Sequence, residues 1–273
     1  MWKKLPLLLR VLLAAMIVTG TATVVWGALV ETNLRISPSM PWGAVTMTGF
    51  LVFYWRFLKG EWWPRSTSTT RREGLRAEKI PVRVLRWALL AGGLGLVSSV
   101  ALFILSHSLF RWQERPQTDL SDIPTITLLP SLLMSAVVAG VSEEAGFRGY
   151  MQGPLERRYG PFAAIATTSV AFGLAHLNHG AFWAAILFDI GWGALYGLLT
   201  YLSGSIVPAI ILHSSADSFE FLAIWKFQVN TAVPLVWERG PDGWFWFNCA
   251  LVVMFGGAAV WAFLRLARAR SNS

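Results

Sequence analysis

The stretch Gly140–Tyr150, GVSEEAGFRGY, decides how the chain is interpreted, because it places three charged residues inside a long apolar segment. One charged side chain at a bilayer centre costs about 2.5–3.5 kcal/mol even on the milder scales, so Glu143, Glu144 and Arg148 need a reason to be there. Glu144 and Arg148 are four residues apart and share a helix face, which predicts an ion pair. Glu143 is turned about 100° away on the same helix and is therefore less well placed to form an ion pair with Arg148. The plainer alternative is a helix end where the charges reach the membrane interface.

The composition indicates an integral membrane protein. Of the 273 residues, 55% are hydrophobic and 14% are charged, whereas a soluble domain has roughly 25% charged residues. The 15 tryptophans and 17 phenylalanines suit membrane interfaces and lipid-facing helices. We expect an all-α, polytopic fold and a single membrane domain over residues 1–273, because no long polar segment is available to fold outside the membrane. The net charge of +8 is explained by topology and by contacts with anionic membrane lipid, and not by nucleic acid.

Hydropathy predicts eight spanning helices, since each span needs about 20 mostly apolar residues. Their expected ranges are Leu5–Val30, Met40–Leu58, Val84–Ser106, Ile123–Gly149, Pro161–Leu177, Ala181–Tyr201, Ser205–Ile224 and Trp244–Leu264. The first range starts like a signal peptide, with positive residues before an apolar core. Because the apolar run continues to Val30, a retained first helix is preferred and cleavage is the alternative.

The distribution of basic residues predicts the orientation. With a cytoplasmic amino terminus, 18 of the 23 Lys and Arg fall on the cytoplasmic side and five on the other. The positive-inside rule therefore favours eight helices with both termini in the cytoplasm, in the plasma (inner) membrane if the source is bacterial. The polar, basic loop Gly60–Arg83 is expected to be mobile and to fix topology, and a regulatory or lipid-contacting role is the alternative.

Two of the four histidines lie within apolar helices and have a companion one helical turn away. His176 follows Phe172 by four residues and His213 precedes Asp217 by four, so each pair lies on one helix face. Asp217 is expected to accept the His213 proton and fix the tautomer of the ring, or to hold a water molecule beside it. A lone histidine in a membrane helix more often forms a hydrogen bond to another helix than acts as a catalytic residue. Several costly polar residues on three neighbouring helices instead predict one shared polar site.

Three motifs, in this order, resemble those of the CAAX protease and bacteriocin-processing enzyme family, which includes the type II CAAX prenyl endopeptidases and the Abi proteins. They are Glu-Glu-x-x-x-Arg at Glu143–Arg148, Phe-x-x-x-His at Phe172–His176 and His-x-x-x-Asp/Asn at His213–Asp217. The resemblance covers about residues 134–218, the expected core of catalytic motifs. It implies an eight-helix intramembrane protease with its site in a cavity open to the cytosol. Asp217 stands where family members often have Asn.

Peptide hydrolysis needs an activated water molecule and a group that stabilises the oxyanion. Glu143 is the predicted base, since Glu144 has a partner, and His176 and His213 are expected to position water or donate to the oxyanion. Supporting roles are predicted for Glu144, Arg148, Phe172 and Asp217. Glu143, His176 and His213 could instead bind zinc with an open position for water. The chain has no His-Glu-x-x-His motif, so a metal-free mechanism is preferred and zinc is kept as the alternative.

The preferred function is an intramembrane endopeptidase. Its substrate would be a prenylated or otherwise lipidated tail, a bacteriocin-like peptide or another membrane protein. The alternative is a non-proteolytic membrane scaffold or immunity protein that retains the fold. A proton-coupled transporter is less favoured, because the charges cluster near one side and no internal repeat is evident.

Overall fold

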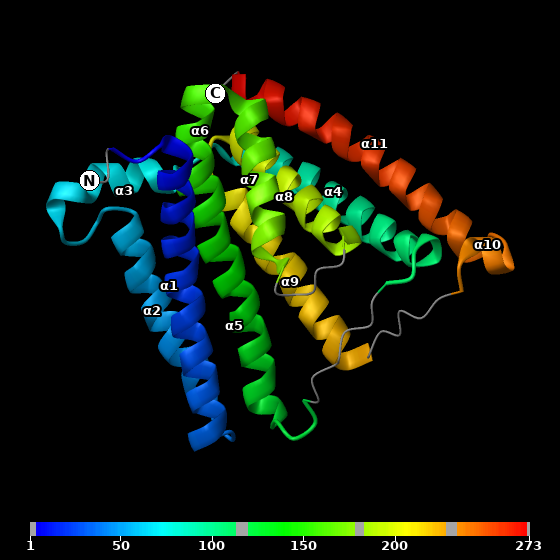
Figure 1. Cartoon of the computed structure of the whole chain (residues 1–273), viewed down its shortest axis with the longest axis horizontal. Coiled ribbons are helices and arrows are strands. Elements are labelled where there is room, and N and C mark those ends of the chain that lie inside the picture. Colours follow the sequence, from blue (N-terminus) through cyan, green and yellow to red (C-terminus); the bar gives the residue numbers. More distant parts are fainter. Residues whose placement is uncertain (1–3, 113–119, 178–182, 228–233, 272–273) are drawn as a thin grey trace. The chain divides into compact units, whose positions relative to one another are not determined.

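The structure is a computed structural model that describes residues 4–112, 120–177, 183–227 and 234–271. This part of the chain contains helices and no strands, which confirms the predicted all-α class. The longer helices are α1 (Leu7–Ile36), α2 (Trp42–Leu58), α4 (Val82–Leu109), α5 (Thr125–Glu143), α7 (Pro161–Ala175), α8 (Trp183–Ser203), α9 (Val207–Phe227) and α11 (Gly243–Ser271) (Figure 1). The short ones are η2 (Arg65–Thr67), α3 (Ser68–Leu75), η3 (Glu144–Gln152), α6 (Gly153–Tyr159) and α10 (Val236–Arg239).

Each of the eight predicted spans overlaps one of the longer helices. Among the described residues, five helical segments are long and apolar enough to cross a membrane: Leu7–Ile36, Val82–Leu109, Thr125–Tyr159, Trp183–Ser203 and Gly243–Ser271. The apolar helix α7 is shorter, and α2 has 17 residues. These segments confirm a polytopic membrane protein, while the number of eight spans stays a prediction.

The first helix extends beyond its apolar run. Glu31 and Arg35 form an exposed ion pair of 2.6 Å at i,i+4 spacing, which supports the extra turn. Asn33 is buried and joins this end of α1 to the start of α2. Its Nδ2 donates to two carbonyl oxygens of the connecting turn, and its Oδ1 accepts the Gly43 N–H at 2.6 Å. A side-chain amide thus satisfies the backbone groups that a tight turn between two helices exposes.

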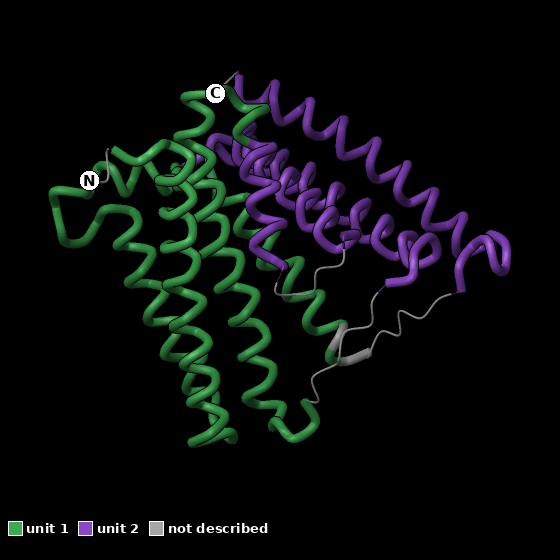
Figure 2. The backbone as a smooth tube through the Cα atoms, in the orientation of Figure 1, with its two compact units in different colours: residues 1–78, 117–164, 205–228 green, residues 79–116, 165–204, 229–273 purple. Residues whose placement is uncertain are grey.

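The chain divides into two compact units that alternate along the sequence (Figure 2). Unit 1 comprises residues 1–78, 117–164 and 205–228, and unit 2 comprises residues 79–116, 165–204 and 229–273. Each unit therefore collects helices that are far apart in the chain. The expectation of a single membrane domain stays a prediction.

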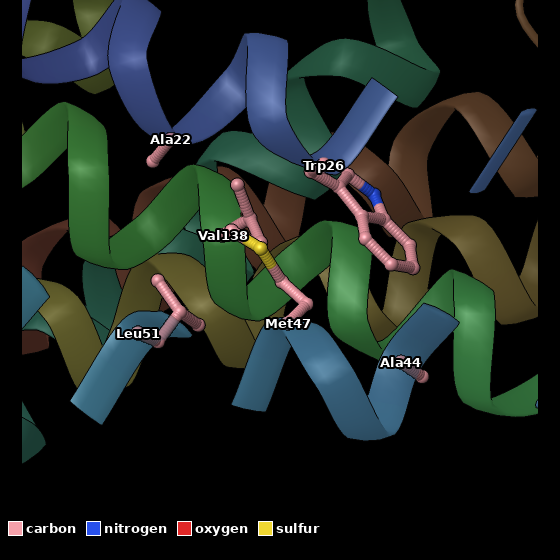
Figure 3. Close-up of a cluster of buried hydrophobic side chains, with 6 residues drawn as sticks. All are labelled: Ala22, Trp26, Ala44, Met47, Leu51 and Val138. Carbon is pink, nitrogen blue, oxygen red and sulfur yellow. The ribbon is translucent and has the colours of Figure 1, made fainter. Parts of the chain in front are cut away.

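Within unit 1, helices α1, α2 and α5 enclose a buried apolar cluster (Figure 3). Its members are Ala22, Trp26, Ala44, Met47, Leu51 and Val138. The alanines let the helix backbones approach, and the larger side chains fill the space between them. The Trp26 indole N–H also donates to Ser135 Oγ on α5 at 2.9 Å. This packing holds the helix that ends at Glu143.

Within unit 2, helices α4 and α11 lie side by side and antiparallel (Figure 1). The Trp87 and Trp261 rings meet near the start of α4 and the end of α11, with centroids 5.3 Å apart. Further along, Ser98 Oγ donates to the Val252 carbonyl at 3.1 Å. Helix α8 packs against both. The beginning of α4 and the end of α11 therefore form one end of this unit.

The basic segment Gly60–Arg83 differs from the expected mobile loop, because it folds around a buried arginine. The Arg71 guanidinium donates to three carbonyl oxygens, those of Phe57, Trp62 and Pro64, at 2.7, 2.5 and 3.1 Å. The Arg71 carbonyl in turn accepts the Tyr150 hydroxyl at 3.1 Å. Carbonyls at a helix end need donors, so one arginine orders the turn and attaches it to η3.

Candidate active site

The glutamate pair lies at the junction of α5 and η3, where the helix changes from α to π. The sequence predicts a continuous α-helix, but Glu144–Gln152 forms a nine-residue π-helix. π-Helices are rare in proteins overall, but those that do occur are often found at functional sites. The predicted ion pair is present: Arg148 Nη1 lies 3.1 Å from Glu144 Oε1, and both side chains are fully buried.

Two glycines let neighbouring helices of unit 1 approach this junction. A Cβ at Gly146 would collide with Thr19 Oγ1 and lie 2.9 Å from the Ala15 carbonyl oxygen of α1. A Cβ at Gly140 would collide with Ser214 Oγ and lie 2.8 Å from the Ser214 backbone nitrogen of α9. Small residues permit such close helix contacts in membranes. The contact at Gly140 brings the neighbouring His213 to Glu144.

Glu144 joins two of the predicted site residues. The same oxygen that pairs with Arg148 lies 2.8 Å from His213 Nδ1. An ionised carboxylate only accepts hydrogen bonds, so Nδ1 carries the hydrogen, and the orientation of the ring is set. The hydrogen bond at Nδ1 is therefore made by Glu144, whereas Asp217 was expected to fix the tautomer or to hold a water molecule. Asp217 Oδ2 lies instead 3.5 Å from the opposite nitrogen, His213 Nε2.

Glu143 faces the same ring nitrogen as Asp217. Its Oε2 lies 3.9 Å from His213 Nε2, which is beyond direct hydrogen-bond distance and suits a bridging water molecule. The Glu143 side chain retains 16% exposure, whereas Glu144 has none. The two adjacent glutamates thus have different environments, as the helical spacing to Arg148 predicts.

Phe172 and His176 belong to unit 2, at the carboxy-terminal end of α7. His176 Nδ1 lies 2.8 Å from the Phe172 carbonyl oxygen, and the two ring centroids are 4.5 Å apart. A carbonyl only accepts, so Nδ1 carries the hydrogen here as well. The predicted pairing on one helix face is present. The convergence of His176 with Glu143 and His213 stays a prediction.

The zinc alternative depends on which side chains can act together as ligands of the metal ion. Within the described ranges, no group of three or more His, Cys, Asp or Glu side chains is arranged to hold a metal ion. His213 presents Nε2 to two carboxylates, while its Nδ1 is engaged by Glu144. Unit 1 by itself therefore does not supply a two-histidine, one-carboxylate site. Zinc bound by Glu143, His176 and His213 stays a prediction.

Sequence reasoning missed a polar network that follows the π-helix. Arg76 Nη2 lies 3.0 Å from Glu156 Oε2, and Gln152 Nε2 donates to Glu156 Oε1 at 2.7 Å. Arg76 also donates to the Arg148 carbonyl at 3.4 Å. The i,i+4 spacing of Gln152 and Glu156 was an available signal. The contribution of Arg76 was not, because it comes from the distant basic segment.

The apolar helices and the buried acid, arginine and histidine side chains define a polytopic membrane protein with candidate hydrolytic residues. Residues 125–219 match the family model described as type II CAAX prenyl endopeptidase Rce1-like. The match spans all three motifs and confirms the resemblance that they indicate. This is a protease family, which supports a CAAX-type intramembrane endopeptidase in general. No curated protein and no solved structure matches the chain.

Proposed function

We propose that the chain is an intramembrane endopeptidase in which Glu143 activates water and His213 and His176 assist. The observation that carries this proposal is the different use of two adjacent glutamates. Glu144 is engaged by both Arg148 and His213 Nδ1, whereas Glu143 lies 3.9 Å from His213 Nε2. The position of the partly exposed Glu143 beside His213 Nε2 supports Glu143 as the carboxylate that takes the proton.

In the proposed reaction, Glu143 takes a proton from water while the water oxygen bonds to the peptide carbonyl carbon. The carbonyl oxygen becomes an oxyanion, which needs a hydrogen-bond donor. When the His213 ring is neutral, its Nε2 positions the water molecule, and His176 donates to the oxyanion. When the His213 ring is protonated, its Nε2 donates to the oxyanion, and His176 positions the water molecule. The C–N bond then breaks, and Glu143 returns the proton to the leaving nitrogen. Glu144 and Arg148 act as positioning residues for His213.

The proposed substrate is a peptide that is itself held at the membrane. A prenylated carboxy-terminal tail follows from the description of the matched family, and a bacteriocin-like or otherwise lipidated peptide has the same physical character. Binding of an apolar anchor would bring the scissile bond to a site that lies within the helices. The competing function is a scaffold or immunity protein, which would bind such a peptide without cleaving it.

The test is Glu143→Gln in the full chain, purified and placed in lipid nanodiscs with an internally quenched, farnesylated CAAX peptide. The substitution keeps the shape of the side chain and removes the base. Turnover should fall by about 10² or more, the scale of general-base catalysis. Binding of the peptide should survive, because the lost interaction belongs to the transition state.

The matched control is Glu73→Gln, which makes the same change at an exposed carboxylate of α3. It should leave turnover unchanged. Cleavage by Glu143→Gln at the wild-type rate would remove Glu143 from the role of base. The scaffold function would be favoured by a different result: the peptides found in the membrane are the same with and without the wild-type protein, and the protein still binds the peptide tightly.

A further inference from the structure

One end of unit 2 combines arginine and tryptophan side chains in a way that the proposed protease site does not use. The first turns of α4 and the last turns of α11 meet there, with Trp87 and Trp261 in edge-to-face contact at 76°. The arginines at this end are Arg83, Arg86, Arg265, Arg268 and Arg270. Neither residues 79–90 nor residues 243–273 contain an aspartate or glutamate. The two helix ends therefore bring a local excess of positive charge.

An open surface depression with a volume of about 440 Å³ lies on the first turns of α4. Its lining is Val82, Arg83, Arg86, Trp87 and Leu90. Two exposed arginines and three apolar residues of one helix thus line the same depression. Leu90 lies one turn beyond Arg86, about 6 Å further along the helix axis. An occupant that satisfies both parts must carry negative charge at one end and hydrocarbon a few ångströms away.

The neighbouring surface of α11 has the same character. The Arg265 guanidinium lies over the Trp261 ring, 5.3 Å from its centroid. Trp261 and Leu264 are exposed, as are Val82 and Leu90 on α4. Tryptophan is enriched where the lipid headgroups begin. Arginine presents a planar fork that matches phosphate oxygens. The order of side chains along both helices therefore follows the order of groups in a phospholipid.

We propose that this end of α4 and α11 is a binding site for an anionic phospholipid, with the phosphate at Arg83 and Arg86 and the first acyl carbons at Trp87 and Leu90. Basic pockets at the cytoplasmic ends of membrane helices commonly bind acidic headgroups, and the charge distribution predicts that side for these arginines. A soluble phosphate would satisfy the guanidinium groups and leave the apolar lining uncovered. The site is independent of the proposed endopeptidase activity.

The test measures lipid retention by native mass spectrometry of the full chain, released from neutral detergent that contains dioleoylphosphatidylglycerol or dioleoylphosphatidylcholine. The wild type should retain phosphatidylglycerol in preference to phosphatidylcholine. Arg83→Gln/Arg86→Gln should lower the affinity for phosphatidylglycerol about thirtyfold. That factor corresponds to about 2 kcal/mol, at about 1 kcal/mol per basic residue and 1.4 kcal/mol per tenfold change. Arg83→Lys/Arg86→Lys keeps the charge and should keep most of the preference.

The matched control is Arg157→Gln/Arg158→Gln, which removes the same charge from two exposed arginines of α6 in unit 1. It should leave the preference intact. Equal losses in the two glutamine variants would show attraction by overall charge and overturn the site. Equal retention of both lipids by the wild type would do the same. Displacement of phosphatidylglycerol by millimolar inorganic phosphate would assign the arginines to a soluble anion instead.

Discussion

At the scale of single residues, the site depends on one buried carboxylate with two partners. Glu144 Oε1 lies 3.1 Å from Arg148 Nη1 and 2.8 Å from His213 Nδ1. Removal of one member of a buried ion pair leaves the other charge without compensation and costs about 3–5 kcal/mol. We therefore propose that Glu144 holds Arg148 and His213 in place, a role distinct from the proton transfer proposed for Glu143.

The substitution Glu144→Gln should lower folded yield and thermal stability together with turnover, because it strands the Arg148 guanidinium and loosens His213. Thermal unfolding in detergent and peptide turnover measure the two effects. Glu31→Gln is the matched control, since Glu31 pairs with Arg35 at the same i,i+4 spacing but on the surface. Its loss of stability should stay within about 1 kcal/mol, as for exposed ion pairs. Equal destabilisation by both substitutions would contradict the structural role of Glu144.

At the scale of helices, the site depends on close contact between α5 and α9. Gly140 lies against the backbone of α9, where a Cβ would be 2.8 Å from the Ser214 nitrogen. Since Ser214 follows His213, any separation of the two helices moves the ring away from Glu144. The change to a π-helix after Glu143 belongs to the same region, where glycines meet neighbouring helices on two sides.

Gly140→Ala should therefore destabilise the protein by about 1–3 kcal/mol, the usual cost of overpacking, and reduce turnover as His213 shifts. Gly20→Ala on α1 is the control, because a Cβ there meets nothing within 4 Å. In that open position, alanine has a higher helix propensity than glycine and should stabilise the protein by up to about 1 kcal/mol. The two variants should thus change the unfolding midpoint in opposite directions. A midpoint raised by both substitutions would exclude the close contact at Gly140.

At the scale of the whole molecule, the helices and the basic residues together predict the orientation. The eight predicted spans overlap α1, α2, α4, α5, α7, α8, α9 and α11. An even number of crossings places both termini on one side, and 18 of the 23 basic residues favour the cytoplasm for that side. The folded segment around Arg71 restricts where a reporter can be inserted without damage.

Reporters fused after Ser273 and inserted after Glu78, which is exposed between α3 and α4, should both read cytoplasmic. A third, placed between Gly240 and Gly243, should read the opposite side. Paired cytoplasmic and periplasmic reporters, such as a fluorescent protein and alkaline phosphatase, provide the measurement. A non-cytoplasmic signal at either of the first two positions would reject the eight-helix topology.

Features that depend on local spacing and composition could be predicted from the sequence. Hydropathy located the long helices, because each must present about 20 apolar residues to lipid. The i,i+4 spacing of Glu144 and Arg148 predicted their ion pair, and the three motifs indicated the similarity that the family match over residues 125–219 confirms. These inferences need no knowledge of which helices are neighbours.

Contacts between groups from distant segments of the chain could not be predicted and are visible only in the folded structure. Glu144 and His213 are 69 residues apart, and their contact exists because Gly140 lets α9 approach α5. From the sequence, Asp217 on the same helix was expected to fix the tautomer of His213 or to hold a water molecule beside it, since local periodicity cannot reveal a partner on another helix. Arg71 is a second example. Its charge predicted a solvated loop, but the carbonyl groups that accept its hydrogen bonds are brought together only by the turn of the folded backbone.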